Sequence, residues 1–534
     1  MVKALLLSNI NMQPLVAFLK PWDVTCGEFN SMFLDLANPA SPAASGDFNH
    51  IFCLFDSDTV LGDALYGNGL PLQAESFLDA LESFCAAHPD KIVVSHSFCL
   101  GSSRWLNYAD MLHPLSLRAA ETGLNGRLIA IARKNPNLLL FDMEVLFRRH
   151  GEDALLSVPM WYLGRIRYSN QMFRALAALM HEAVDAYANR SRKVLVLDLD
   201  NTLWGGIVGE AGPLGIALSE DGPGRCYRDL QRAIKAIQRT GILLAISSKN
   251  NPRDVDEVFD RNPMMVLRRE DFACIRANWD PKPQNILDIA ETLNLGADSF
   301  VFIDDSPVER ELVAAAIAGI AVPEFPKHVE NLPTWLLREV APNYFGKYSI
   351  TAEDAGKTGQ YRANEERRQL SRTLDLDVFL RDLQIECVIH VDPVEQVNRI
   401  AQMTQKTNQF NLTTRRYEVP QIRKFLESQE HAVILLEYKD RFGSEGSVGL
   451  AILDYAGGRI DTFLMSCRVI GRKVEDRMLE TICELFAKRG LNRISGEFIP
   501  TAKNQQVARF YETHGFSLLS EQADGRKNYQ RSLA

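Results

Sequence analysis

The stretch from Lys193 to Gly206, KVLVLDLDNTLWGG, decides how the centre of this chain folds. Residues 194–197 are apolar, which is typical of a strand buried inside a parallel sheet. Asp198 and Asp200 follow, and because side chains alternate along an extended chain, both carboxylates point the same way. Two like charges so close together are costly unless a cation neutralises them or one keeps a proton. The alternative is that this motif only caps the following turn.

Three further segments have a similar character. The stretch from Gly241 to Asn251, GILLAISSKNN, is a second apolar strand, and it ends in hydroxyls and an amine. The loop WDPKP, which begins at Trp279, places a lysine between two prolines. The stretch FVFIDDSP, which begins at Phe300, is a third apolar strand and ends in an acidic pair. Because the tips of parallel strands converge on one crevice, we expect all four segments to meet there.

This combination of residues predicts phosphoryl chemistry. Asp198 would attack phosphorus and form an aspartyl phosphate, while Asp200 would protonate the leaving oxygen and later activate water. Ser248 and Lys282 would donate to the transferring phosphoryl oxygens and so stabilise their charge. For Lys282 alone, the alternative is a solvated surface lysine.

The strand tips also predict a metal site and a substrate site. Carboxylate and phosphate oxygens suit Mg²⁺. The predicted metal ligands are the acidic residues of the first and last motifs, Asp198, Asp200, Asp304 and Asp305. The predicted substrate-binding residues are other polar residues of the motifs, Thr202, Ser247, Lys249 and Asn250.

These motifs resemble the haloacid dehalogenase (HAD) superfamily. DLDNTLWGG, SKNN, RANWD at residues 276–280 and DDSP together look like its FkbH-like subfamily, and the match covers most of the chain. The resemblance implies that the protein takes a glyceryl group from 1,3-bisphosphoglycerate, removes the phosphate and loads the acyl group onto the phosphopantetheine thiol of an acyl carrier protein. Such a reaction belongs to polyketide or related biosynthesis.

One residue departs from the family pattern. A cysteine is expected directly before Ser248, but this chain has Ser247 there. If that cysteine is the glyceryl acceptor, the protein uses another thiol, passes the acyl group directly to the carrier, or performs different chemistry. Cys226 and Cys274 are the candidate relay thiols, and the alternative for each is a small buried hydrophobic residue.

Composition limits the class of protein. At about 150 residues per domain, 534 residues suggest roughly three domains. A net charge of −9 argues against nucleic-acid binding. An acidic carrier would need only a local basic patch, for which Lys249, Arg253, Arg268 and Arg269 are candidates. No apolar stretch is long enough to cross a bilayer, no secretory signal is evident and the nine cysteines lack paired spacing, so we expect a cytoplasmic protein.

Residues 1–188 predict a small doubly wound domain of alternating strands and helices. In FkbH-like proteins this region resembles an SGNH-hydrolase fold. Ser8 has the position of the nucleophile, but LSN replaces the expected GDS. The Asp-x-x-His pairs at 47–50 and 110–113 come too early to supply its base. We therefore expect a degenerate scaffold or docking module without hydrolytic activity.

The predicted catalytic core, residues 190–345, has no insert large enough for a cap domain. A macromolecule would then supply the lid over the site, which favours a carrier-bound acyl group over a free metabolite alone. Residues 346–374 are polar and predict a linker, with an exposed helix over 361–373.

Residues 375–534 predict an antiparallel sheet with strands near 383–390, 432–437, 447–453 and 459–464, then a turn and a helix over 474–489. This pattern resembles the GNAT acyltransferase fold, whose turn holds a CoA or phosphopantetheine pyrophosphate at a helix N-terminus. The residues that the resemblance implies for this role are Arg468, Gly471, Arg472, Lys473, Asn504 and Tyr511. The alternative is a structural turn without a ligand. The segment Thr407–Arg415 also matches the FkbH-like pattern, but the sequence gives it no chemical role.

The sequence thus predicts an α/β protein with a Rossmann-like doubly wound HAD core, flanked by an SGNH- or flavodoxin-like α/β domain and a GNAT-like α+β domain. Its predicted function is Mg²⁺-dependent glyceryl transfer to a carrier protein. One alternative is a phosphatase of a free phosphorylated metabolite, fused to a separate CoA-dependent acyltransferase. The other is a non-catalytic scaffold that binds a carrier protein.

Overall fold

The computed structural model describes residues 2–66, 71–102, 106–114, 116–188, 190–350, 352–371 and 376–533. The chain divides into two compact units, Met1–Tyr187 with Glu418–Lys424, and Ala188–Tyr417 with Phe425–Ala534. No described helix combines the length and the apolar character that crossing a membrane requires.

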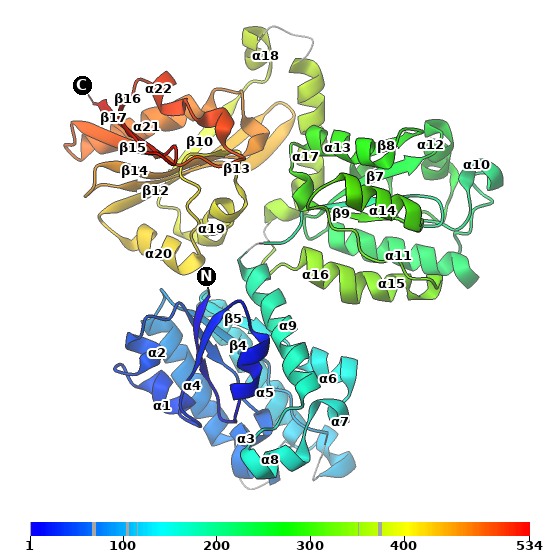
Figure 1. Ribbon diagram of the computed structural model, residues 1–534, viewed down its shortest axis with the longest axis vertical. Helices are drawn as coiled ribbons and strands as arrows, with labels where there is room; N and C mark the ends of the chain where they lie inside the picture. Colours follow the sequence, from blue (N-terminus) through cyan, green and yellow to red (C-terminus); the bar gives the residue numbers. More distant parts are fainter. Residues whose placement is uncertain are drawn as a thin grey trace. The chain divides into compact units, whose positions relative to one another are not determined.

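The first unit is built on a five-stranded parallel sheet (Figure 1). The strands, in spatial order, are β2 (Asp23–Cys26), β1 (Lys3–Leu7), β3 (His50–Cys53), β4 (Ile92–His96) and β5 (Leu138–Phe141). This 2-1-3-4-5 order is that of a flavodoxin-like fold. The expected flavodoxin-like class is therefore confirmed, although the sequence did not indicate the edge strand β2.

Helices cover both faces of this sheet. Apolar residues of α4 and α5 pack with Leu5 and Ile51, while those of α9 pack with Leu6 and Phe52 from the opposite face. The helices are α1 (Met32–Ala37), α2 (Pro42–Ser45), α3 (Ser57–Leu61), α4 (Leu72–Ala87), α5 (Leu117–Lys134), α6 (Glu144–His150), α7 (Glu152–Leu155), α8 (Val158–Gly164) and α9 (Asn170–Tyr187).

The second unit begins with a four-stranded parallel sheet of order β8-β7-β6-β9. Its strands are β6 (Val194–Leu197), β7 (Leu243–Lys249), β8 (Phe272–Asn278) and β9 (Phe300–Ile303). The apolar run of the opening motif, which forms β6, is thus a fully buried central strand, as predicted. Leu195 and Leu197 pack on the side of α11 and α15, and Val194 and Val196 on the side of α13 and α14 (Figure 1).

The helices around this sheet are α10 (Val208–Ala211), α11 (Gly222–Gln238), α12 (Pro252–Arg261), α13 (Lys282–Leu293), α14 (Pro307–Ala316), α15 (Leu332–Trp335) and α16 (Ala341–Phe345). A π-helical turn, Leu336–Val340, joins α15 to α16. Helices on both faces of a parallel sheet are the doubly wound arrangement that the sequence predicts.

The rest of the second unit is an eight-stranded sheet of order β10-β12-β13-β14-β15-β17-β16, with β11 paired to β14. All its pairings are antiparallel except β14 with β15. The strands are β10 (Glu386–Val391), β11 (Phe410–Asn411), β12 (His431–Asp440), β13 (Gly443–Asp454), β14 (Arg459–Met465), β15 (Arg493–Phe498), β16 (Ser517–Glu521) and β17 (Lys527–Ser532). The expected α+β class is confirmed.

The remaining helices are α17 (Ala352–Ser371), α18 (Leu376–Asp382), α19 (Val397–Lys406), α20 (Val419–Glu427), α21 (Val474–Lys488) and α22 (Phe510–Thr513). The predicted linker helix corresponds to α17, which begins nine residues earlier than expected; residues 372–375, where the predicted linker ends, lie outside the described residues. This helix is not simply exposed, because Asp354, Thr358 and Arg367 on it are buried.

Candidate active site

Three carboxylates meet at the tips of β6 and β9. The two strands pair in parallel, with Leu197 opposite Ile303, and Asp198 N donates to Ile303 O at 3.0 Å. Oxygen atoms of Asp198, Asp304 and Asp305 therefore lie within 4.8 Å of one another. Asp198 and Asp304 are buried and Asp305 is half-buried. This is a compact set of hard oxygen donors, of the kind that holds Mg²⁺.

Lys282 is the cation among these carboxylates. Its Nζ lies 2.8 Å from Asp198 Oδ1 and 2.5 Å from Asp304 Oδ2, and only 5% of its side chain is exposed. The residue starts α13, where Pro283 favours the first helical turn. This burial excludes the alternative that Lys282 is a solvated surface lysine.

Burial shapes the charge of this cluster. It raises the pKa of Asp198 to about 6, against the opposing effect of Lys282, and the charge of Asp304 adds to the rise. Burial also raises the pKa of Asp305, again with a contribution from Asp304. Although burial lowers the pKa of Lys282, the two carboxylates outweigh it and raise that pKa overall. The lysine therefore stays protonated, and the carboxylates carry more negative charge than it offsets.

Asp200 has different partners from the other acidic residues. Its Oδ1 accepts from Trp204 Nε1 at 2.8 Å and from Val208 N at 3.0 Å, and its Oδ2 accepts from Asn250 Nδ2 at 3.0 Å. The group of three carboxylates does not include it. These three donors fix the orientation of the Asp200 carboxylate beside the cluster, which suits a proton-transfer group.

The glycine turn of the opening motif makes this arrangement possible. A Cβ on Gly205 would lie 2.8 Å from the ring of Tyr227, so only glycine fits without a shift. Gly206 has a φ of +91°, and its N donates to Asn201 Oδ1 at 2.9 Å. Trp204 is fully buried, and the sequence did not indicate that its indole would hold Asp200. The signal that could have indicated it is a tryptophan four residues after Asp200 in the same motif.

The end of β7 supplies the polar side of the site. Ser248 hydrogen-bonds Asp198, and its Oγ also accepts from Asn250 Nδ2 at 3.1 Å. Thr202 Oγ1 accepts from Asp305 N at 3.2 Å, which ties the first motif to the last. Ser247 is buried, and its Oγ has no hydrogen-bond partner among the described residues.

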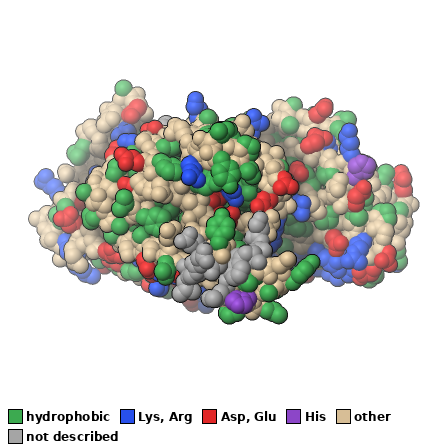
Figure 2. All heavy atoms as spheres, turned by 90° about the horizontal axis from the view of Figure 1, so that it is seen from below, with side chains coloured by type: hydrophobic (Ala, Val, Ile, Leu, Met, Phe, Trp, Pro, Cys, Tyr) green, Lys and Arg blue, Asp and Glu red, His purple; other side chains and the backbone are tan. Residues whose placement is uncertain are grey.

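Three of the four residues that the sequence predicts for a basic patch form ion pairs with acidic residues. Lys249 lies 2.7 Å from Glu309, Arg253 lies 3.3 Å from Glu257, and Arg269 pairs with Asp256. Figure 2 shows Lys and Arg side chains gathered toward the right-hand end of the face that it draws. The cation within the site is none of these, because Lys282, which the sequence predicted for this role, lies between Asp198 and Asp304.

The two candidate thiols occupy different environments. Cys274 is buried on β8 and pairs with Ala245, three residues before Ser248, which is about 10 Å along the strand. Cys226 is partly exposed on α11, next to the Tyr227 ring that contacts Gly205. Cys226 is thus the thiol whose chain neighbour touches the opening motif.

The first unit holds the predicted serine at the end of β1. Ser8 is buried, and its Oγ accepts from Ile10 N at 3.2 Å. Ser8 also lines a cavity with Gly27 and Arg165. His50 lies on β3, and its Nδ1 contacts Asn49 Oδ1 at 2.8 Å.

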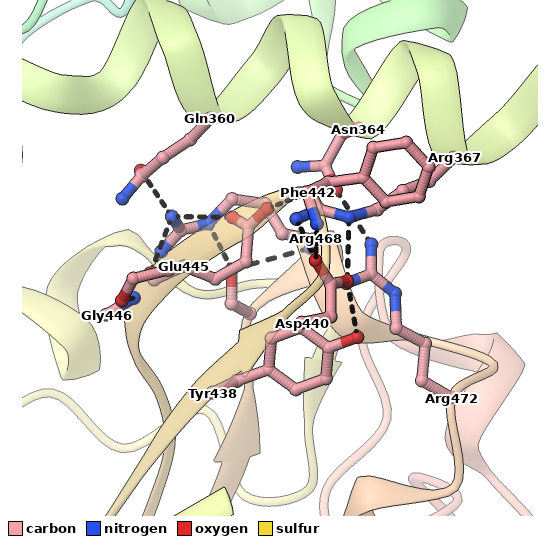
Figure 3. Close-up of polar contacts among 12 residues, drawn as sticks. Gln360, Asn364, Arg367, Tyr438, Asp440, Phe442, Glu445, Gly446, Arg468 and Arg472 are labelled. Atoms are coloured by element: carbon pink, nitrogen blue, oxygen red, sulfur yellow. Dashed lines mark hydrogen bonds and ion pairs between the residues drawn. The ribbon is translucent and has the colours of Figure 1, made fainter. Parts of the chain in front are cut away.

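The predicted pantetheine turn before α21 is crossed by α17 (Figure 3). Arg468 donates to Gln360 Oε1 at 2.5 Å and forms an ion pair with Glu445 at 3.1 Å. Arg472 donates to Asn364 Oδ1 at 2.7 Å. The side chains of both arginines are less than one-tenth exposed. Intramolecular partners therefore hold the two side chains expected at a pyrophosphate.

The other residues predicted to bind pantetheine or CoA have structural roles. Asn504 donates to Asn411 O and Ile499 O, both at 2.9 Å, and thereby joins two loops. Tyr511 is buried in the core, and its ring fits only because residue 496 is glycine. Gly471 and Lys473 both have positive φ, +82° and +57°, so the turn places a lysine in a conformation that favours glycine.

A solved structure matches about two-thirds of the chain. The N-terminal part of the protein BF1531 from Bacteroides fragilis, a crystal structure containing a phosphatase domain complexed with Mg, matches with a TM-score of 0.60 and 27% sequence identity. The match covers 65% of this chain and 95% of that one. No family model matches the sequence. No curated protein matches it either.

Acetyltransferase structures match a smaller part. The ribosomal-protein-S18-alanine N-acetyltransferase from Escherichia coli has a TM-score of 0.22 and 13% identity over 28% of this chain and 95% of its own. A putative GNAT-family acetyltransferase from Desulfovibrio desulfuricans has a TM-score of 0.22 and 14% identity over 28% and 99%. Over about two-thirds of its length the chain is thus similar to a structure that contains a phosphatase domain, and it also carries a mostly antiparallel α+β domain.

Proposed function

We propose that this protein is a Mg²⁺-dependent enzyme that transfers a glyceryl group from 1,3-bisphosphoglycerate to the phosphopantetheine thiol of an acyl carrier protein and removes a phosphate. The observation that carries the phosphate step is the buried cluster of Asp198, Asp304 and Asp305 around Lys282. The glyceryl and carrier assignments rest on the resemblance of the motifs to FkbH-like proteins.

The donor set fits Mg²⁺ because it offers carboxylate oxygens in excess of the single lysine charge. Asp198, Asp304 and Asp305 would hold the ion, which when bound would offset charge on the phosphoryl oxygens. The likeness to a phosphatase domain solved with Mg supports this choice of metal.

The side chains divide the phosphate step between them. Asp198 attacks the phosphorus of the 3-phosphate ester, and the bond from phosphorus to the glyceryl oxygen breaks as Asp200 donates a proton to that oxygen. Asp200 then takes a proton from water, which attacks the aspartyl phosphate and releases inorganic phosphate. Lys282 and Ser248 lie beside Asp198 and stabilise the charge that develops on the phosphoryl group.

The acyl step needs a thiol. Attack of the thiol on the C1 carbonyl breaks the acyl-phosphate bond, releases phosphate and forms a thioester. The carrier thiol acts directly, or Cys226 relays the acyl group. Cys226 suits this role better than Cys274 because it is partly exposed, whereas Cys274 is buried.

A phosphatase of a free phosphorylated metabolite is the second candidate function. It is favoured by two observations, Ser247 at the position of the expected cysteine and the ion-paired state of Arg468 on the pantetheine turn.

Intact-mass analysis separates the candidates. The protein is incubated with Mg²⁺, 1,3-bisphosphoglycerate and a phosphopantetheinylated carrier. A glyceryl adduct on the carrier supports the proposal, and free phosphate with an unmodified carrier supports the second function. Neither event, with tight carrier binding, indicates a scaffold. Asp198→Asn should lower phosphate release at least 100-fold, whereas the exposed control Asp260→Asn on α12 should not change it. Full activity of the first variant would exclude the assigned nucleophile.

A further inference from the structure

A cavity of about 400 Å³ lies in the second unit, away from the carboxylate cluster. Residues that precede β6, β7 and β9, among them Lys193 and Ser299, line one side of it. The carboxylates follow the opposite ends of the same strands, and β6 alone is about 13 Å long. The end of α19 and the segment Thr407–Gln409 line another side. This volume is typical of pockets that hold small ligands.

Most charged side chains that line the cavity are positive. Among the described residues, eight basic side chains line it against one carboxylate, that of Asp298. Asp298 is itself bound by Lys503, with 2.6 Å between Nζ and Oδ2. A cavity of this kind attracts anions, because cations that face each other in a partly dehydrated space are costly without counter-charge.

Among the described residues, the cations that line the cavity have few acidic partners. Lys347 lies 3.0 Å from Asp354, and Lys357 pairs with the same oxygen of that buried carboxylate, so one negative charge serves two lysines. Lys406, at the end of α19, faces the same space. Burial and the positive charges of Lys357 and Lys347 lower the pKa of Lys406 well below its usual value.

The polar part of the lining could select a ligand. Thr407, Asn408 and Gln409 belong to the segment to which the sequence assigned no role. Gln409 Nε2 donates to Asn294 Oδ1 at 2.9 Å, and its buried Oε1 has no hydrogen-bond partner among the described residues. An acceptor left without a donor in a basic cavity suits a ligand that carries hydroxyl or amide hydrogens beside its anionic group.

We propose that this cavity is a second ligand site, separate from the phosphatase centre, and that it binds a small phosphate ester through Lys406 and Lys357. A phosphate dianion supplies the missing counter-charge to several lysines at once. Two sources share this chemistry, a free phosphorylated hydroxy acid and the phosphate end of a pantetheine chain. The site does not depend on the proposed function, because none of the strand-tip carboxylates lines it.

Isothermal titration calorimetry of the full-length protein tests the site with three probes: inorganic phosphate, 3-phosphoglycerate and phosphopantetheine. We expect Lys406→Gln and Lys357→Gln each to weaken binding at least tenfold, and Lys406→Arg to retain it. Lys439→Gln, an exposed lysine on β12, is the matched control and should bind as the wild type does. Asp198→Asn should also bind normally, so that loss of catalysis and loss of this site are distinguishable.

The pattern of affinities identifies the source. Tighter binding of 3-phosphoglycerate indicates a metabolite site, and tighter binding of phosphopantetheine indicates a site for the carrier arm. A rise in melting temperature with the same probe, absent in Lys406→Gln, is the second readout. Equal affinity of Lys406→Gln and the wild type, or no binding of any of the three probes to folded protein, would overturn the proposal.

Discussion

At the scale of the residue, burial and the neighbouring charge of Lys282 have opposite effects on the pKa of Asp198. Burial favours its neutral form, Lys282 favours its charged form, and Asp304 opposes a second charge nearby. The fold is therefore less stable for keeping a reactive carboxylate out of water. Active-site groups are often destabilising in this way, and replacing them then stabilises the fold.

The pKa shift of Asp198 gives a stability prediction with a definite sign. Between the ordinary value of 3.8 and about 6, the unfolded chain has released this proton while the folded chain still holds it. The folded state therefore loses stability as pH rises from 3.8 to about 6. The loss in the free energy of unfolding is about 3 kcal/mol at most. Without metal, Asp198→Asn should unfold at higher denaturant than the wild type at pH 7.5.

Denaturant melts at pH 4.5 and pH 7.5 measure this difference, with Asp260→Asn as the control. The gain in stability of Asp198→Asn over the wild type should be larger at pH 7.5 than at pH 4.5. A gain that is larger at the lower pH would contradict the raised pKa of Asp198.

At the scale of the element, α17 is held to the C-terminal sheet by a buried arginine (Figure 3). Arg367 donates to Asp440 Oδ2 at 2.8 Å and to Oδ1 at 2.6 Å, and it also pairs with Glu445. Both acids are fully buried, and the arginine side chain is 2% exposed. The same acids bind Arg472 and Arg468 of the turn, so helix and turn share one network.

Removal of Arg367 should be strongly destabilising. Arg367→Met leaves two buried carboxylates with fewer partners, and breaking a buried ion pair costs about 3–5 kcal/mol. Chemical denaturation measures the loss. Arg362→Met, at an exposed position of the same helix, should change stability by less than about 0.5 kcal/mol. A loss below about 1 kcal/mol for Arg367→Met would mean that the network does not hold α17 in solution.

At the scale of the whole molecule, the sequence predicts what depends on local pattern. The run from Val194 to Leu197 and the acidic pairs after two strands indicate a parallel sheet with polar tips, and the structure has this sheet. The site residues converge because strand tips of one sheet must do so. The spacing of the motifs along the sequence was therefore enough to predict most residues of the candidate site.

What the sequence could not give depends on contacts between distant residues. Arg367 and Glu445 are 78 positions apart, and no periodicity links them. The same holds for the basic cavity, whose Lys193, Lys357 and Lys406 come from three separate segments. Each of these lysines alone is indistinguishable from a solvated one. Charge complementarity across a fold becomes visible only when the fold is known.

The division into two compact units predicts two unfolding events. The catalytic core and the C-terminal domain lie in one unit, and contacts such as Gln409 with Asn294 and Lys503 with Asp298 join them. Scanning calorimetry should therefore show one transition for the first unit, residues 1–187 with 418–424, and a second transition shared by the rest of the chain. Mg²⁺ at 100 times its dissociation constant should stabilise only the second unit, by about 2.7 kcal/mol. Only the temperature of the second transition should therefore rise.

Asp304→Asn is the control for this experiment, because it removes a carboxylate of the cluster without touching the first unit. Its second transition should no longer respond to Mg²⁺, while its first stays where the wild type has it. Three transitions would show that the C-terminal domain unfolds apart from the catalytic core. A Mg²⁺-dependent shift of the first transition would show that the metal acts outside the strand tips, because ligand stabilises only the cooperative unit that binds it.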